Sequence, residues 1–236
     1  MRRLVALSLL SGCVTVTDLS SESFDASNVF VVSARMEAGD FSYVGRPSQG
    51  TFDVDARRFG NGSNEEAAAE RLAGTSWMGS VEGDALLLDV STTQGQSGVD
   101  LAVTGPRIVD LDIATDRGTV RPSRVEGIHV ITASNVRGDF VGDADIFTTG
   151  SVTLDVVPFV QTDMRIEAGG SVTLYLPFGA DYDLTVRSDG DDELVVDDLG
   201  FDEVQLGQGF FNGFRVPGTV RIDILASGNV AVRELR

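Results

Sequence analysis

The chain has 236 residues, 36 of them acidic and 18 basic, and all of the basic ones are arginine, so its formal net charge is −18. A surface this acidic repels nucleic-acid phosphates and anionic lipid headgroups, which argues against a nucleic-acid partner and against membrane binding through a basic patch. With one cysteine and one histidine, the chain has neither a disulfide framework nor a zinc–thiolate centre. No cofactor is predicted.

The amino terminus reads MRRLVALSLLSGC: two arginines, an apolar run, small residues and the cysteine. This order is that of an export signal, and the run is shorter than the ~20 apolar residues that span a bilayer. The stretch LSGC also looks like the lipobox of bacterial lipoproteins. We therefore predict a signal peptide at 1–12 and a lipid anchor on Cys13, with a buried first strand or helix as the alternative.

Two further expectations concern this end of the chain. By resemblance to lipoprotein sorting rules, Val14 in place of an aspartate favours the outer membrane of the bacterial envelope over the inner one. The residues that follow are polar and serine-rich, which predicts a short tether over 13–28.

From Val29 onward, apolar and polar residues alternate in short runs such as VFVVSARM and TFDVDARRF, which is the pattern of half-buried strands. The segment 60–74 is instead rich in alanine and glutamate. Its Ser-Asn-Glu-Glu start and its final Gly74 predict a short helix, inserted at 63–73 in a β-repeat domain that spans 29–236. We expect Trp77 and Met78, which follow it, to cover an open end of the array.

Two later stretches are nearly identical, GSVTLDVVPF at 150–159 and GSVTLYLPF at 170–178. Such repetition predicts an all-β fold, a β-solenoid or single-stranded β-helix in which stacked units share one core and the short helix is a cap. A β-sandwich, which also has short strands and frequent turns, is the alternative. Related strand openings begin at Val109, Ile128, Ala144, Asp163, Tyr182 and Val220.

For two motifs in this region we favour a structural interpretation over a functional one. His129 lies between Ile128 and Val130, and we expect it on the outward face as a surface residue rather than a catalyst. The tripeptide at 137–139, Arg-Gly-Asp, is a sequence that some animal cell-surface receptors bind. We expect instead that its glycine is there because the chain turns at this point.

The segment 181–203 is densely acidic. Asp189, Asp191, Asp192 and Glu193 are candidates for a weak calcium site, because clustered carboxylates supply the oxygen ligands that Ca²⁺ takes. Their spacing matches no known calcium loop, so we favour a solvated acidic face that keeps the array soluble.

The densest aromatic group is Phe210, Phe211 and Phe214. These side chains either form a platform for stacking ligand sugar rings or, as we favour, plug the carboxyl-terminal end of the array. No catalytic residue and no metal ligand is predicted beyond these candidates.

The whole pattern resembles the putative-adhesin repeat domain of bacterial envelope proteins. The resemblance rests on an early strand pair followed by the Ser-Asn-Glu-Glu helix, on VDLAVTGPRIVDLDIATDRGTV at 99–120, and on the later copies through VRIDILASGNVAVREL. It implies stacked β-repeats, attachment to a membrane and no established catalytic residues.

The sequence therefore predicts a non-enzymatic, lipid-anchored envelope protein, an adhesin or a binding scaffold with an extended acidic surface. Its expected partners are the membrane, through Cys13, and a polysaccharide or another envelope protein. A periplasmic partner in envelope stress or assembly is the alternative, and a glycan-active enzyme is the third interpretation.

Overall fold

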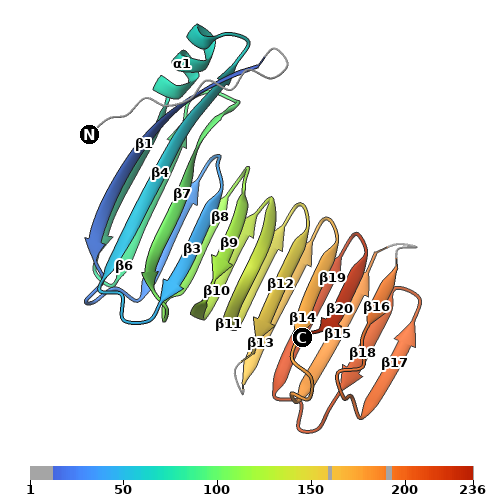
Figure 1. The fold of residues 1–236 in the computed structure, drawn as a ribbon. Coiled ribbons are helices and arrows are strands. Elements are labelled where there is room, and N and C mark those ends of the chain that lie inside the picture. Colours follow the sequence, from blue (N-terminus) through green and yellow to red (C-terminus); the bar gives the residue numbers. More distant parts are fainter. Residues whose placement is uncertain (1–12, 159–160, 190–192, 236) are drawn as a thin grey trace.

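The computed structural model describes residues 13–158, 161–189 and 193–235, and within these ranges it has twenty strands and one helix. The prediction of an all-β chain is confirmed. The strands lie side by side along an elongated array, with the long strands β1 (Val14–Asp25) and β4 (Thr51–Gly62) and the helix at one end (Figure 1).

Hydrogen-bonded pairing arranges the strands in two rows. In spatial order, the first row consists of β5 (Thr75–Glu82), β6 (Ala85–Thr92), β2 (Val31–Met36), β8 (Asp110–Thr115), β10 (Val125–Ala133), the end of β11 (Asn135–Thr148), β13 (Thr162–Ala168), β19 (Val220–Ala226), β15 (Tyr182–Ser188), β18 (Phe210–Phe214) and β17 (Glu203–Gly207).

The second row consists, in the same direction, of β1 (Val14–Asp25), β4 (Thr51–Gly62), β7 (Ser97–Pro106), β3 (Phe41–Arg46), β9 (Thr119–Ser123), the start of β11, β12 (Val152–Val157), β14 (Val172–Leu176), β20 (Val230–Glu234) and β16 (Leu194–Val196).

The near-identical sequence copies become neighbours in space. Strands β12 and β14 pair in parallel with Val152 opposite Val172 and Leu154 opposite Leu174, so equivalent positions of the two copies face each other. Parallel pairing prevails through the middle of both rows, and antiparallel pairs are found toward the two ends.

Spatial order departs from sequence order at three places, one of which is β18, which lies between β15 and β17. The early pair β2 and β3 lies between β6 and β7 on one side and β8 and β9 on the other. The last pair, β19 and β20, lies between β13 and β14 on one side and β15 and β16 on the other. Both chain ends of the repeat region are thus held inside the array by two neighbours each.

A period of two gives most strands one buried face, whereas β1, β16 and β17 have no buried residue. The inward side chains of both rows form one contiguous apolar core, which includes Phe41 and Leu101 in one half and Leu154 and Leu174 in the other. Burying each such side chain contributes about 1.5–3 kcal/mol, so the stacking of strands supplies the main stabilisation of the array.

The helix prediction is confirmed as α1 (Glu65–Ala73), which is capped by Asn64 rather than by Ser63. The side-chain oxygen of Asn64 accepts a 2.9 Å hydrogen bond from the amide of Ala67. The helix lies against glycines of β4: a Cβ on Gly60 would sit 2.3 Å from the carbonyl oxygen of Ala68. Only a residue without a side chain permits this approach.

Trp77 and Met78 differ in what they cover. Trp77 packs against the core, and its indole nitrogen donates a 2.9 Å hydrogen bond to the hydroxyl of Ser20 on β1. Met78 is 63% exposed, so the expectation that it covers the end is wrong. Successive residues of a strand point to opposite faces, and only one of the two can face the core.

The segment expected to be a tether, 13–28, is mostly strand. Residues of β1 pair with β4 along its whole length, from Val14 opposite Gly62 to Asp25 opposite Thr51. None of its side chains is fully buried. Its polar, serine-rich composition is that of an exposed edge strand rather than of a flexible linker, and this corrects the expectation.

Candidate functional site

The predicted lipidation site and calcium cluster are only partly described. Cys13 is exposed and carries a free thiol, whereas the signal peptide at 1–12 lies outside the described residues. Asp191 and Asp192 also lie outside them, while Asp189 and Glu193 are exposed on either side. Among the described residues, no three metal-ligating side chains are grouped closely enough to hold an ion. The calcium site stays a prediction.

The predicted aromatic group lies at the β17 and β18 end of the array. Phe211 is buried, and its ring meets that of Phe201 edge-on with centroids 5.4 Å apart. Phe201 in turn lies 6.4 Å from the buried Tyr182. Phe210 and Phe214 are half-buried. This position suits an end plug better than a platform open to ligands.

The expectation for His129 is wrong. Its side chain is fully buried in β10, where it lies opposite Leu111 and Ala144, and Ile128 and Val130 point outward instead. Among the residues that the structure describes, neither ring nitrogen has a hydrogen-bond partner. Burial lowers the pKa of His129 to about 4, against an opposing attraction from the charge of Asp110. The imidazole is therefore a neutral core group at physiological pH.

The tripeptide Arg137-Gly138-Asp139 lies within strand β11 rather than in a turn. Its glycine is needed for close packing, because a Cβ there would sit 1.9 Å from the carbonyl oxygen of Pro122. The carboxylate of Asp139 is engaged: it accepts hydrogen bonds from the hydroxyl of Ser123 at 2.9 Å and from the amide of Arg124 at 2.7 Å.

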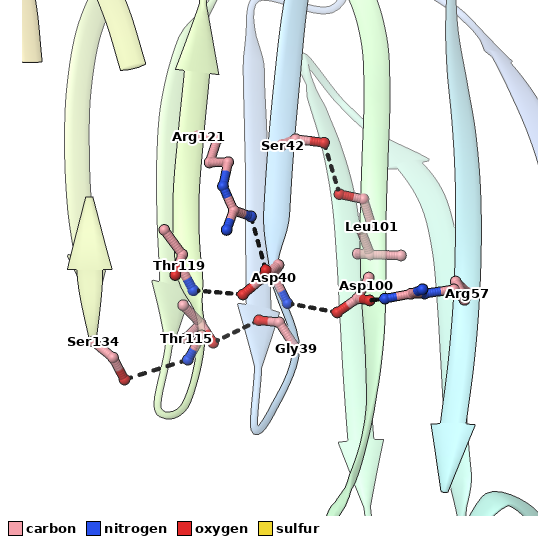
Figure 2. A network of polar contacts seen from close by, with 11 residues as sticks. Gly39, Asp40, Ser42, Arg57, Asp100, Leu101, Thr115, Thr119, Arg121 and Ser134 are labelled. Atoms are coloured by element: carbon pink, nitrogen blue, oxygen red, sulfur yellow. Dashed lines mark hydrogen bonds and ion pairs between the residues drawn. The ribbon is translucent and has the colours of Figure 1, made fainter. Parts of the chain in front are cut away.

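The outer face of the second row carries two polar regions. The first, which we call the charge ladder, crosses β4, β7, β3 and β9 and is drawn in Figure 2. Arg57 binds the carboxylate of Asp100, which accepts a 2.9 Å hydrogen bond from the amide of Asp40. Asp40 in turn accepts from the amide of Thr119 at 2.9 Å and from the guanidinium of Arg121 at 2.8 Å.

The charged groups of the ladder are paired with one another. Burial alone would raise the pKa of Asp40, but hydrogen bonds from Arg121 and Thr119 and the positive charges of Arg121 and Arg57 outweigh it and lower that pKa below its usual 3.8. Each carboxylate meets a guanidinium and a backbone amide. Such an arrangement aligns four strands and leaves little hydrogen-bonding capacity for a ligand.

The second region is a groove of about 810 Å³ over β11, β12, β14 and β20, which we call the Tyr175 groove. Strand register places one column of outward side chains along it: Asp139 opposite Asp155, Asp155 opposite Tyr175, and Tyr175 opposite Arg233. The groove is lined by Arg137, Gly138, Asp139, Thr153, Asp155, Tyr175, Asp197, Arg233, Glu234 and Leu235.

The three tyrosines of the chain differ in their burial and in the hydrogen bonding of their hydroxyl groups. Tyr43 and Tyr182 are fully buried, and each donates a 2.6 Å hydrogen bond to a proline carbonyl, of Pro106 and Pro177 respectively. Tyr175 is only half-buried and, within the described part of the chain, has no hydrogen-bond partner. Its ring and its hydroxyl are therefore open to the groove.

Charged groups of the Tyr175 groove are also partly free. Asp155 and Arg137 are exposed, and neither has a hydrogen-bond or ion-pair partner among the described residues. Asp155 lies directly opposite Asp139, and like charges facing each other across strands destabilise a sheet. On the other side, Arg233 is oriented by Asp197 at 3.2 Å. The groove thus keeps an acceptor, a donor and an aromatic ring available, which the ladder does not.

Sequence reasoning missed this groove, although one signal was present. The copies GSVTLDVVPF and GSVTLYLPF differ after their shared leucine, where one has Asp155 and the other Tyr175. Stacking the copies in register places these two residues side by side on the outer face.

Comparison with known proteins gives only distant likenesses to solved structures. No family model and no curated protein matches the chain. Among solved structures it is similar to a putative cell adhesion protein from Clostridium sporogenes, at 11% identity over 92% of this chain and 100% of the other, with a TM-score of 0.47. A putative adhesin from Bacteroides fragilis is 10% identical over 92% and 97%, with a TM-score of 0.31.

A putative lipid binding protein from Parabacteroides distasonis is also 10% identical over 92% and 97%, with a TM-score of 0.26. At these TM-scores the likenesses carry no functional argument. As for membrane-spanning helices, the described residues contain none of the required length and apolarity.

Proposed function

We propose that this chain is a non-enzymatic, lipid-anchored protein of the bacterial cell envelope that binds a partner through the outer face of its second row, as an adhesin or a binding scaffold. The observation that carries the proposal is the contrast on that face: within the described part of the chain, the Tyr175 groove keeps an aromatic ring, a carboxylate and a guanidinium unpaired. Exposed, unpaired groups gathered in a concave site suit binding rather than stability.

The scaffold in this proposal is a β-solenoid rather than a β-sandwich. A sandwich of the immunoglobulin type is built from antiparallel strands. Here the near-identical copies stack in parallel and in register, which supports a repeat array whose neighbours share one core. Such an array offers a long, flat surface for a partner.

The anchor in this proposal is a lipid on Cys13, at the end of the array that carries α1. Strand β1 begins directly after Cys13, with Val14 opposite Gly62, three residues before α1. The Tyr175 groove lies on strands toward the other end (Figure 1). An anchor at Cys13 would hold that groove away from the membrane surface. The choice of the outer membrane in this proposal rests on Val14, which stands where an aspartate would favour the inner membrane.

The test is protease accessibility on intact and on permeabilised cells, with a Cys13→Ala variant fractionated beside the native chain. We expect digestion on intact cells and release of the Cys13→Ala variant from the membrane fraction. Protection in intact cells would overturn surface binding and support a periplasmic partner instead. Retention of the variant in the membrane would overturn the lipid anchor.

A glycan-active enzyme is the second candidate, favoured by one observation. Asp139 and Asp155 face each other on adjacent strands, and paired carboxylates are the groups that glycoside hydrolysis uses. The hydrogen bonds that hold Asp139 in place argue for a structural acid instead. Time-dependent release of reducing ends that Asp155→Asn abolishes would favour the enzyme.

A further inference from the structure

We infer that the Tyr175 groove binds a saccharide chain, neutral or amino-bearing, with the ring of Tyr175 as its stacking surface. This inference rests on the proposed function and names the ligand class of the same site. It follows from three properties of the groove: its aromatic ring, its free hydrogen-bonding groups and its charge.

The first property is the partly exposed ring of Tyr175 in the wall of the groove. A pyranose has an apolar face of C–H groups, which covers an aromatic ring while the sugar hydroxyls stay at the rim. Tyr175 lies between Asp155 on β12 and Arg233 on β20, so polar groups stand on both sides of the ring along the stacking direction. A sugar ring over Tyr175 would therefore meet an acceptor on one side and a donor on the other.

The second property is the kind of free groups. Sugar hydroxyls both donate and accept hydrogen bonds, so a saccharide site needs both kinds of partner. Within the described chain Asp155 offers free acceptor oxygens, Arg137 offers free donors, and the Tyr175 hydroxyl offers either. Arg233 is fixed by Asp197, which keeps its guanidinium in place beside the ring.

The third property is charge. The groove has four carboxylates, of Asp139, Asp155, Asp197 and Glu234, against the guanidinium groups of Arg137 and Arg233, a formal charge of −2. This repels sulfated or uronic-acid chains and accepts neutral or amino sugars. The net charge of the whole chain, −18, acts in the same direction.

The experiment measures binding of the full chain, purified in detergent, to four probes: glucose oligomers, N-acetylglucosamine oligomers, glucosamine oligomers and heparin. Isothermal titration is compared for the native chain, Tyr175→Ala and Phe147→Ala. Phe147 is the matched control, because it lies on β11 in the first row, where the guanidinium of Arg165 stacks over its ring at 5.8 Å.

We expect at least one of the three uncharged or amino-bearing probes to bind, and Tyr175→Ala to weaken that binding at least about tenfold, while Phe147→Ala leaves it unchanged. Binding to none of the probes, equal binding by Tyr175→Ala, or preference for heparin would overturn the inference. Far-ultraviolet circular dichroism is recorded for both variants to establish that they are folded.

The inference and the proposed function fail in different ways. A chain that is exposed on intact cells but binds no saccharide would keep the adhesive role and lose the ligand class. A chain that is protected in intact cells but binds saccharide through Tyr175 would keep the ligand class and lose surface adhesion.

Discussion

The charge ladder and the Tyr175 groove lie on the same face of the same row, built from strands of the same kind, yet they use their charges in opposite ways. In the ladder, Asp40 and Asp100 each meet an arginine and a backbone amide. In the groove, Asp155 meets no cation among the described residues and faces another aspartate. A paired acid contributes to strand alignment, whereas an unpaired one is retained at some loss of stability, which is typical of a binding site.

The largest expected effect on stability comes from a substitution at Gly39, where two backbone segments that support the ladder lie very close together. Gly39 precedes Asp40, has a φ of +124°, and a Cβ there would lie 1.9 Å from the carbonyl oxygen of Val99. We expect Gly39→Ala to lower the free energy of unfolding by at least about 3 kcal/mol. Denaturant unfolding measures this. Gly50→Ala is the matched control, since nothing lies within 4 Å of its Cβ, and a similar loss in the control would contradict the account.

The second effect concerns His129, on β10 at the middle of the array. Its folded pKa of about 4 lies below the usual 6.5, so the fold binds the proton less well than the unfolded chain does. His129 therefore contributes stability that is present above pH 6.5 and is lost as the pH falls toward 4, by about 3 kcal/mol.

The matched variant is His129→Leu, which removes the titrating group and keeps an apolar side chain in the core. We expect it to be no less stable than the native chain at pH 7.5, because neither ring nitrogen of His129 has a hydrogen-bond partner in the described chain to lose. Melting temperatures between pH 4.5 and 7.5 test this. An unchanged pH dependence in His129→Leu would show that other groups are responsible.

A smaller effect is expected in the ladder itself. Asp40→Asn removes the charge that Arg121 and the amide of Thr119 bind, and we expect a loss of about 1 kcal/mol, limited because the pair is partly exposed to solvent. The lowered pKa of Asp40 predicts that its contribution disappears as the pH falls below 3.8. Asp145→Asn, at an exposed acid that has no partner in the described chain, should change the melting temperature little.

The smallest effect on stability is expected in the groove. Arg137 has no ion-pair partner in the described chain, so Arg137→Gln should change the free energy of unfolding by no more than about 0.5 kcal/mol. The same variant should weaken saccharide binding, because it removes a free donor. A loss of stability comparable to that of Asp40→Asn would mean that the groove, like the ladder, is structural.

Much of the fold could be predicted from the repeat pattern of the sequence. Alternation with a period of two predicted strands, and the GSVTL copies predicted neighbours, because equivalent side chains of stacked units must share one core. Strand order at the ends was not predictable in the same way. The strand that begins at Val220 pairs in register with both β13 and β15, and local sequence does not state that it lies between them.

The sequence also left open which of the two alternating sets of side chains in a strand faces the core. Around His129 the alternation is clear, but alternation alone does not say which set faces the core. Because Ile128 and Val130 are apolar, they were expected to face the core and His129 to face outward. In the structure His129 lies opposite Leu111 and Ala144 and faces the core instead. The Tyr175 groove depends on register in the same way: Asp155 and Tyr175 come from equivalent positions of two sequence copies, and Arg233 comes from a strand much later in the sequence.

The measurement that tests the central contrast most directly applies one chemical change in both regions, Asp100→Asn in the ladder and Asp155→Asn in the groove. For each variant, the melting temperature and the affinity for the saccharide probe that the native chain binds are recorded. We predict that Asp100→Asn lowers the melting temperature and leaves the affinity unchanged, whereas Asp155→Asn lowers the affinity and keeps or raises the melting temperature, because it removes the repulsion from Asp139. If Asp155→Asn destabilises the chain and leaves the affinity intact, the groove is not the binding site.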